Sequence, residues 1–356
     1  MLKYCVGLDV SSKDFYACLS AIDPLQKVTV KCSSKFPNNP SGFHSLDAWL
    51  SKHHKQKDIR LVVVMEATGV YYEHLALFLY LKGYEVSVVL PNKAKKYLQA
   101  TGLKSKNDTI DAQGLSRMGA EQSLDLWQPK DEYFYQLRSL TRQHQSLQEL
   151  KTNVNNQLHA DQHGMYQNEV VISQLMVLIK TLDAQIEEME KAIVAHLDKD
   201  AEVAKLVEGI TLIKGVGALT VAIILAETNG FALFKNIPQL ISFAGYDVVE
   251  NQSGNHVGKT RISKKGNGHI RRCLYLPALS VVRCQQSPFV QLFNRTLARH
   301  GIKMKSYVAV QKKLLVLIYV MWKKKEAYQP TRNANHSGEQ EQMSSSLLSF
   351  EEAGLL

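Results

Sequence analysis

The sequence predicts an α/β domain built on a mixed sheet, followed by an α-helical arm and a mainly helical C-terminal domain. Three strand-like segments lie within residues 3–36, and helix-like and strand-like segments then alternate to about residue 122, which indicates a mixed sheet with covered faces. Beyond it, apolar residues recur at three- and four-residue spacing, as in long amphipathic helices. We place the domains at 1–125, 126–200 and 201–328, with a disordered tail at 329–356.

The first domain is expected to contain five strands. Apolar alternation and short apolar runs predict strands at 3–10, 14–22, 27–36, 60–65 and 85–90. Ser41 is expected to cap a helix over 43–53, and a second helix ends at Gly83. Pro91 is expected to end the last strand, with a basic loop leading to a third helix that begins at Asp108.

The second and third domains are expected to be helical. Apolar spacing along residues 137–158 and 172–193, with a break near 161–167, predicts an antiparallel helical hairpin or a dimerising coiled coil. In either case its expected role is that of a scaffold or oligomerisation arm. The C-terminal domain is expected to have helices at 201–209, 218–228, 237–246, 268–284, 288–300 and 304–325, with a polar loop or ribbon at 247–267.

The composition is that of a soluble protein, with 45% hydrophobic and 21% charged residues. No apolar run has transmembrane length and no signal peptide is visible. The five cysteines form no Cys-x-x-Cys pair, which argues against zinc and fits a reducing compartment. We therefore expect a cytoplasmic protein.

Positive charge is concentrated in one segment. Residues 251–325 contain 16 Lys and Arg and no Asp or Glu, so the rest of the chain carries 27 basic against 33 acidic residues. Such a segment is the footprint of a polyanion site, and we expect nucleic acid rather than membrane. Upstream of it, Lys214-Gly215-Val216-Gly217 joins two predicted helices. This pattern is typical of a helix-hairpin-helix that holds phosphate, although an ordinary interhelical turn would look the same.

Four acidic residues are candidate metal ligands. Asp108 and Asp111 share one face of a predicted helix, after five lysines (Lys93, Lys95, Lys96, Lys104 and Lys106). Asp9 and Glu66 end two predicted strands. In a ribonuclease-H-like sheet these positions meet, and four carboxylates there would hold two Mg²⁺ ions about 3.5–4 Å apart for displacement at a phosphodiester. Alternatively, Asp108 is a helix cap and the other acids are exposed surface residues.

Eight ordered motifs resemble those of one family. In the first half they are Gly7–Lys13 (GLDVSSK), Met65–Gly69 (MEATG) and Lys106–Ala112 (KNDTIDA). In the second half they are Gly215–Gly217, Phe243–Gly245, Gln252–Gly254, Arg261–Gly266 and Ile270–Ala278. This set, spread over residues 3–325, resembles the DEDD transposases of the insertion-sequence one-ten family, whose relatives include the Piv DNA invertases.

The resemblance implies a RuvC-like domain carrying Asp9, Glu66, Asp108 and Asp111, and a transposase domain whose nucleophilic serine falls on Ser253. It further implies strand exchange through a phosphoserine linkage, donor and target DNA, a guiding bridge RNA, and dimers or tetramers with composite active sites. On the residues alone, Ser253 is one of many loop serines with no base at triad spacing, although His256 is near.

The expected phosphate contacts are basic or glycine residues around these motifs. They are Lys104, Lys106, Lys214, Gly215, Gly217, Lys259, Arg261, Lys264, Lys265, Arg271 and Arg272. The alternative for the charged ones is a solvated basic surface. The chain departs from the family at Tyr246–Val248, where Leu-x-Pro is common, and at Asn255, where a second serine is common.

We therefore expect a transposase or site-specific DNA recombinase that uses Mg²⁺ and a serine nucleophile. One rival is a metal-dependent junction endonuclease in which water is the nucleophile. The other is a non-enzymatic nucleic-acid-binding protein whose carboxylates are structural.

Overall fold

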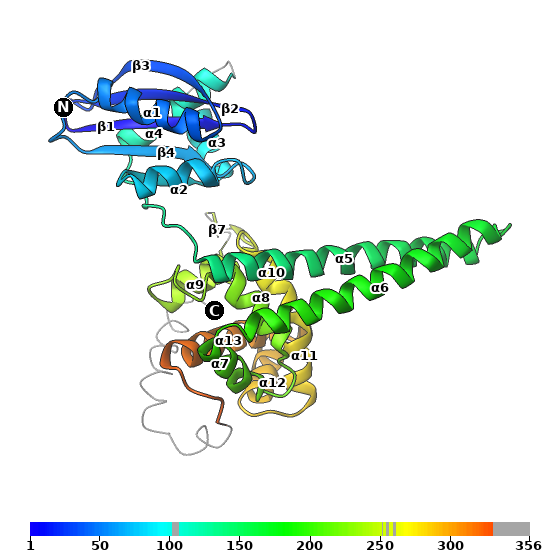
Figure 1. The fold of residues 1–356 in the computed structure, drawn as a ribbon. Coiled ribbons are helices and arrows are strands. Elements are labelled where there is room, and N and C mark those ends of the chain that lie inside the picture. The colour runs from blue at the N-terminus through cyan, green and yellow to red at the C-terminus, as the bar shows by residue number, and fades with distance from the viewer. Residues whose placement is uncertain (102–106, 251, 254–255, 259–260, 330–356) are drawn as a thin grey trace. The chain divides into compact units, whose positions relative to one another are not determined.

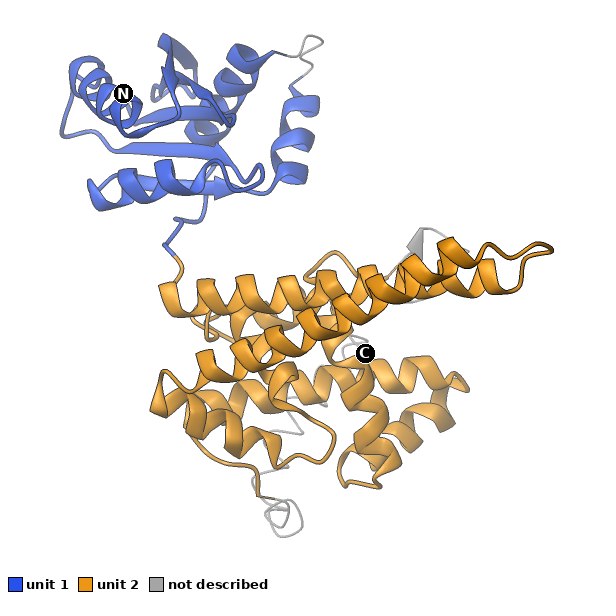
Figure 2. Cartoon of the chain, turned by 45° about the vertical axis from the view of Figure 1, so that its right-hand side comes forward, with its two compact units in different colours: residues 1–129 blue, residues 130–356 orange. Residues whose placement is uncertain are grey.

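The computed structural model forms two compact units, Met1–Pro129 and Lys130–Leu356 (Figure 2). The structure describes residues 1–101, 107–250, 252–253, 256–258 and 261–329, with only the backbone described at 252–253 and 256–257. The expected tail therefore lies almost entirely outside the described residues. Three of the expected phosphate contacts also lie outside the described residues: Lys104, Lys106 and Lys259.

Unit 1 contains the expected five-stranded mixed sheet, in the order β3-β2-β1-β4-β5 (Figure 1). Its strands are β1 (Lys3–Val10), β2 (Asp14–Ile22), β3 (Val28–Pro37), β4 (Leu61–Glu66) and β5 (Glu85–Val89). The first three form an antiparallel meander, whereas β4 pairs parallel with both β1 and β5. The sheet is therefore mixed, as the sequence predicted.

Helices cover both faces of this sheet. They are α1 (Pro40–His53), α2 (Glu73–Leu81), α3 (Pro91–Ala100) and α4 (Asp108–Glu121). On one face Val6 and Leu8 pack with Leu46 of α1 and Leu75 of α2. On the other face of the sheet, the residues of β1 and β4 that alternate with these pack against α3 and α4. Alternate residues of β1 and β4 therefore point toward α4.

Two predictions in this unit are wrong. The cap of α1 is Asn39, whose side chain accepts a hydrogen bond from the Gly42 N–H, so Ser41 lies inside the helix. The expected basic loop after Pro91 is helix α3. Proline has no N–H to donate, but the first turn of a helix does not need one, so Pro91 starts a helix there.

Unit 2 begins with the arm. Its two helices, α5 (Glu132–Gln162) and α6 (Glu169–Leu197), lie side by side and contact each other through Leu147, Val154, Leu182 and Ile186 (Figure 1). The predicted hairpin and its break are thus observed within one chain.

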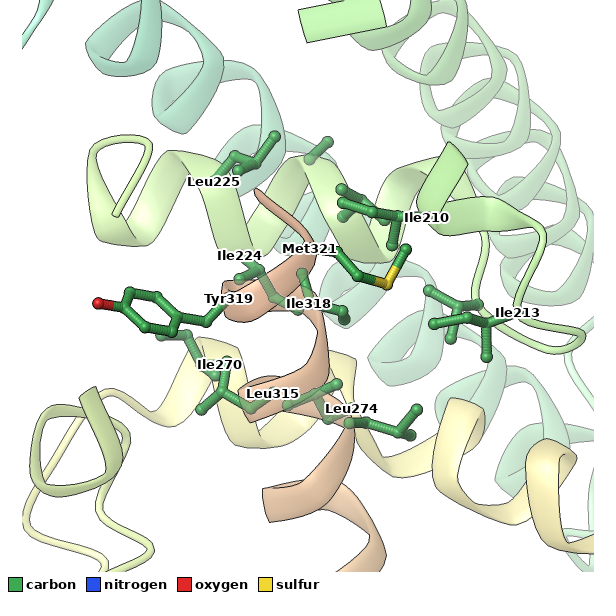
Figure 3. Close-up of a cluster of buried hydrophobic side chains, with 14 of the residues drawn as sticks. Ile210, Ile213, Ile224, Leu225, Ile270, Leu274, Leu315, Ile318, Tyr319 and Met321 are labelled. Atoms are coloured by element: carbon green, nitrogen blue, oxygen red, sulfur yellow. The ribbon is translucent and has the colours of Figure 1, made fainter. Parts of the chain in front are cut away.

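The remaining helices of unit 2 pack around one apolar core. They are α7 (Ala201–Thr211), α8 (Ala218–Thr228), α9 (Ile237–Ala244), α10 (Gly268–Cys273), α11 (Tyr275–Arg283), α12 (Phe289–His300) and α13 (Lys303–Lys324). Ile210, Ile224, Ile270 and Ile318 meet in this core (Figure 3). Leu137 at the base of the arm belongs to the same cluster, so the arm is anchored by the core.

The predicted helix 268–284 is in fact two helices, separated at Leu274. Pro277 explains the break, since its ring would clash with the carbonyl of Cys273 in a continuous helix. In the described part of the chain, no helix is long and apolar enough to cross a membrane.

Candidate active site and nucleic-acid interface

Asp9 and Glu66 lie next to each other at the ends of two parallel strands. In the register of β1 and β4, Leu8 is opposite Met65, and the following residues are Asp9 and Glu66. Both are half-buried. Thr68 Oγ1 donates a hydrogen bond to Glu66 Oε1 at 3.0 Å. The two carboxylates therefore share one edge of the sheet, as the sequence predicted.

Both side chains also face helix α4. A Cβ atom on Gly7 would lie 2.1 Å from the Ala112 carbonyl oxygen, so the helix backbone rests directly on β1 at this glycine. Val64 of β4 contacts α4 at Gly119. Because strand side chains alternate, Asp9 and Glu66, each two residues farther along, emerge on the same face.

The first turn of α4 lies toward the Asp9 end of β1. Gly119, late in the helix, packs against Cys5, whereas Ala112, early in the helix, packs against Gly7. The helix therefore runs opposite to β1, and its beginning extends past Gly7. Two strand residues rise about 6.6 Å and four helical residues about 6 Å, so Asp9, two residues beyond Gly7, lies level with the first turn of α4.

Asp108 and Asp111 occupy that first turn. The cap is Asn107, whose Oδ1 accepts a hydrogen bond from the Ile110 N–H at 2.8 Å. The alternative in which Asp108 caps the helix is therefore wrong. Asp108 is exposed and Asp111 half-buried, so neither carboxylate is used in capping.

The described residues bring the four acids to one face and one edge, but not into a formed metal cage. Among them, no group of three or more His, Cys, Asp or Glu side chains is placed to hold a metal ion. The donor set consists only of carboxylate oxygens, which suits a hard divalent cation. Such a cation would also offset the repulsion of like charges gathered at one edge.

Ser253 lies at the tip of a β-ribbon in unit 2. Strands β6 (Val248–Val249) and β9 (Arg261–Ile262) pair antiparallel, as do β7 (Gln252–Ser253) and β8 (His256–Val257). In the inner pair the backbone of Ser253 is opposite that of His256. We refer to residues 246–263 as the serine hairpin.

The base of the serine hairpin is held by close backbone packing. A Cβ atom on Gly266 would lie 2.4 Å from the Gly245 nitrogen. Arg271 donates hydrogen bonds to the carbonyl oxygens of Ala244 at 2.7 Å, Lys264 at 3.3 Å and Asn267 at 3.4 Å. The segments that enter and leave the hairpin are thus joined at one point. Tyr246, which follows Gly245, is buried and donates a hydrogen bond to Gln311 Oε1 at 2.9 Å.

A buried carboxylate, Glu227 at the end of α8, connects this base to the arm. Arg142 of α5 donates to both its oxygens, at 2.8 and 3.1 Å, and Arg138 lies 3.6 Å away. Asn267 Nδ2 donates to Glu227 Oε2 at 2.6 Å, while the Asn267 N–H donates to the Phe243 carbonyl. Burial acts to raise the pKa of Glu227, but the Arg142 and Asn267 hydrogen bonds and the arginine charges outweigh it and lower that pKa.

Two further contacts extend this connection along α5. His269 Nδ1 lies 2.6 Å from Gln145 Oε1, and Arg272 forms an ion pair with Glu149. Arg138, Arg142, Gln145 and Glu149 occupy one helical face, which we call the α5 polar face. None of these positions, nor Glu227 or Asn267, was singled out from the sequence. The only local signal was Asn267 before Gly268, a helix-cap pattern.

The predicted phosphate contacts differ in their surroundings. Lys214, Arg261, Lys264 and Lys265 are exposed. Arg271 and Arg272 already have partners within the chain, so their binding of phosphate stays a prediction.

The two glycines of the α7–α8 turn differ as well. Gly215 has φ +98° and packs against Ser280, whereas a Cβ on Gly217 would meet open space. The first glycine is thus required by the fold, and the second is not.

Two family models match the chain. One for DEDD-type IS110 transposases, described as "Transposase", matches residues 6–162, and one described as "Transposase IS116/IS110/IS902 family" matches residues 208–293. The chain is also similar to the pilin gene-inverting proteins of Moraxella bovis and Moraxella lacunata. Each is 28% identical over 325 residues, which is 90% of this chain and 96% of the relative.

Solved structures of similar fold cover about a third of the chain. Thermus thermophilus RuvC in complex with a Holliday junction substrate matches with a TM-score of 0.27 and 11% identity, over 35% of this chain and 99% of that one. A fowlpox virus resolvase with Holliday junction DNA matches with a TM-score of 0.25 and 15% identity, over 33% and 97%. On the two family models and the full-length relatives, the chain belongs to the IS110 family of transposases and is a DNA recombinase.

Proposed function

We propose that the chain cuts and rejoins DNA strands with Mg²⁺ bound by Asp9, Glu66, Asp108 and Asp111, and with Ser253 as the nucleophile. The observation that carries this proposal is the placement of two neighbouring strand ends and one helix turn at the same edge and face of unit 1. Three of these acids are half-buried, which limits their hydration and increases the value of a cation partner.

The metal site would be completed by small side-chain movements of four carboxylates on fixed elements. Two Mg²⁺ ions per site would neutralise the charge of the phosphate oxygens and lower the pKa of an attacking hydroxyl. The chain itself supplies rigid placement, because α4 cannot move along β1 without leaving the groove at Gly7.

In the proposed reaction the Ser253 Oγ forms a bond to the phosphorus while the bond to one deoxyribose oxygen breaks. The serine proton ends on that sugar oxygen, leaving a phosphoserine diester and a free hydroxyl. Reversal with a different strand's hydroxyl rejoins DNA. Ser253 and the four acids belong to different units, so the serine could be supplied by the same chain or by another copy in a dimer or tetramer assembled through the arm.

We further propose that unit 2 binds both DNA and a bridge RNA. The acid-free segment 251–325 and its exposed Arg261, Lys264 and Lys265 support phosphate binding next to the serine hairpin. The exposed Lys214 supports it at the α7–α8 turn, at the other end of α8 from Glu227. The α7–α8 turn would act as a helix-hairpin-helix, with Gly217 as the approach point. RNA that co-purifies with the chain and pairs with the cut DNA would support guidance, and protein that is free of RNA yet fully active would contradict it.

The deciding experiment traps the covalent intermediate. Wild-type protein, the Ser253→Ala variant and a matched Ser173→Ala control from the arm are incubated with labelled junction DNA and Mg²⁺, then denatured. We expect labelled protein in the wild type and control only. Unimpaired cleavage by Ser253→Ala would instead favour a water nucleophile, and full activity of Asp9→Asn would show that the carboxylates are structural.

A further inference from the structure

Two loops of unit 1 begin next to the proposed metal ligands of β1 and β4. Residues 11–13 follow the strand that carries Asp9, and residues 67–72 lead from Glu66 to α2. A third loop reaches the same edge of the sheet. Strands β1 and β3 both pair antiparallel with β2, so they run in the same direction and end at the same edge. The residue that follows β3 is Asn38.

The backbone pairing between β1 and β4 stops just before the two acids. Its last pair is Leu8 with Met65. The backbone of Asp9 pairs with β2 on one side, and the backbone of Glu66 pairs with β5 on the other. Each acid is therefore held by the strand on its outer side, and the distance between the two strand ends is set by contacts other than this pairing.

The Asn38 side chain joins the two loops beyond the last pair. Its Nδ2 donates hydrogen bonds to the Ser11 carbonyl oxygen at 2.8 Å and to the Tyr71 carbonyl oxygen at 3.1 Å. Because both partners are acceptors, only the amide nitrogen can serve them, and its two N–H groups diverge within one plane. A planar group that is bonded on both sides fixes the separation of its partners. We call this pair of hydrogen bonds the Asn38 bridge.

Asn38 is anchored on the side of β1. Its backbone N–H donates to the Lys13 carbonyl oxygen at 2.9 Å, and the next residue, Asn39, caps α1. The turn that it contacts is also closed internally, since the Ser11 N–H donates to the Asp14 carbonyl oxygen at 2.9 Å. The side-chain amide is therefore held in place independently of the loop 67–72.

We propose that Asn38 is a positioning residue that fixes the distance between the strand ends carrying Asp9 and Glu66, and so preorganises these two carboxylates for a divalent cation. The inference rests on the proposed function in taking both acids as metal ligands. Residues that orient metal ligands without touching the ion typically contribute about 10- to 100-fold to metal affinity. Loss of the Asn38 bridge should therefore weaken cation binding although every ligand remains.

The first measurement is hydrogen exchange of the full chain without metal. Asn38→Leu is close to asparagine in size but has no donor, and Asn38→Ser can donate to only one of the two carbonyls, so each breaks the bridge. In both variants we expect faster exchange of the Ala67 and Thr68 amides, which are hydrogen-bonded at the start of the second loop. The matched control is Asn39→Ala, which removes the cap on the Gly42 N–H and should speed exchange only in α1.

The second measurement titrates the full chain with Mn²⁺, which suits the same oxygen ligands as Mg²⁺ and is detected in its free form by electron paramagnetic resonance. We expect Asn38→Leu and Asn38→Ser to bind Mn²⁺ about 10-fold more weakly than the wild type, and Asn39→Ala to bind it as the wild type does. Asn38→Gln, which restores both donors on a longer stem, should recover part of the loss.

Equal Mn²⁺ affinities for the Asn38 variants and Asn39→Ala would overturn the proposal, even with faster exchange, because the bridge would then be structural only. Asp9→Asn separates this failure from that of the proposed function. If Asp9→Asn loses Mn²⁺ affinity and the Asn38 variants do not, only the role of Asn38 is rejected. If Asp9→Asn binds Mn²⁺ as the wild type does, the proposed metal ligands are wrong and the role of Asn38 falls with them.

Discussion

The two parts of the proposed active site are positioned by different kinds of contact. In unit 1 the carboxylates are placed by direct packing of the α4 backbone on β1, with no side chain between them at Gly7. In unit 2 the base of the serine hairpin combines backbone packing at Gly266 with polar contacts from Glu227, Asn267 and Arg271, including a buried ion pair. The first arrangement should be sensitive to added volume and the second to changes of charge or pH.

The largest effect is expected at the acid edge itself. Asp9→Asn and Asp111→Asn each keep the side-chain shape but remove a charge. Cleavage in Mg²⁺ should fall by about 10³-fold, the equivalent of several kcal/mol of transition-state stabilisation. For Asp111→Asn, thermal unfolding without metal should show no loss of stability, since like charges are fewer. If cleavage by either variant stays within tenfold of the wild-type rate, the substituted aspartate is not a ligand of the proposed metal site.

Gly7→Ala tests whether packing alone positions the acids. The new Cβ would lie 2.1 Å from the Ala112 carbonyl and 2.2 Å from the Ser116 nitrogen, so α4 must shift away from β1. We expect a loss of about 1–3 kcal/mol in unfolding free energy. Cleavage by the folded fraction should also fall, although all four carboxylates remain.

The matched control is Gly42→Ala, whose Cβ would lie 1.9 Å from the Pro37 carbonyl oxygen on the face covered by α1. It should lower stability to a similar extent but leave cleavage by the folded fraction unchanged. Equal loss of cleavage in both variants would show that packing at Gly7 has no particular role.

Glu227→Ala tests whether the polar contacts of unit 2 support the base of the serine hairpin. It leaves Arg142 and Asn267 without their buried acceptor, and we expect unfolding of unit 2 to cost about 3 kcal/mol less in urea titrations. Asp183→Asn, which breaks an exposed ion pair on the arm, should have little effect. A loss for Glu227→Ala no larger than that of Asp183→Asn would contradict the proposed support of the hairpin.

The same carboxylate should make unit 2 sensitive to acid. Because the pKa of Glu227 is lowered in the folded state, its contribution to stability is complete above the usual value of 4.5 and is lost as pH falls through the folded pKa. Below pH 4.5, wild-type stability should therefore decline more steeply than that of Glu227→Gln, which cannot titrate. Parallel pH profiles would show that Glu227 is not the responsible group.

The smallest effect distinguishes the two glycines of the α7–α8 turn. Gly215→Ala places a Cβ 2.5 Å from that of Ser280 at a positive φ, and should cost about 1–3 kcal/mol. Gly217→Ala meets open space and should cost less than about 1 kcal/mol. If Gly217 approaches phosphate, its substitution should weaken DNA binding by a folded protein. Unchanged DNA binding would show that the α7–α8 segment is an ordinary interhelical turn.

The sequence predicted what local patterns encode. Alternation and apolar runs located the five strands, and the position of acids at their ends indicated one edge of a sheet. Contacts between distant segments were not predictable in the same way. No local pattern marks Glu227 as buried, because only the fold brings Arg142 and Asn267 to it. Pro91 was predicted to end a strand but begins α3, and the predicted helix 268–284 is broken before Pro277, because a proline is tolerated in the first turn of a helix but not inside it.

Helix α5 runs without interruption from Glu132 to Gln162, about 46 Å, and its first half carries the α5 polar face. A continuous helix has no internal joint, so a rotation imposed at its far end is transmitted to Arg138 and Arg142. Under the proposed assembly through the arm, a displacement at its tip would therefore reach the base of the serine hairpin through Arg142, Glu227 and Asn267.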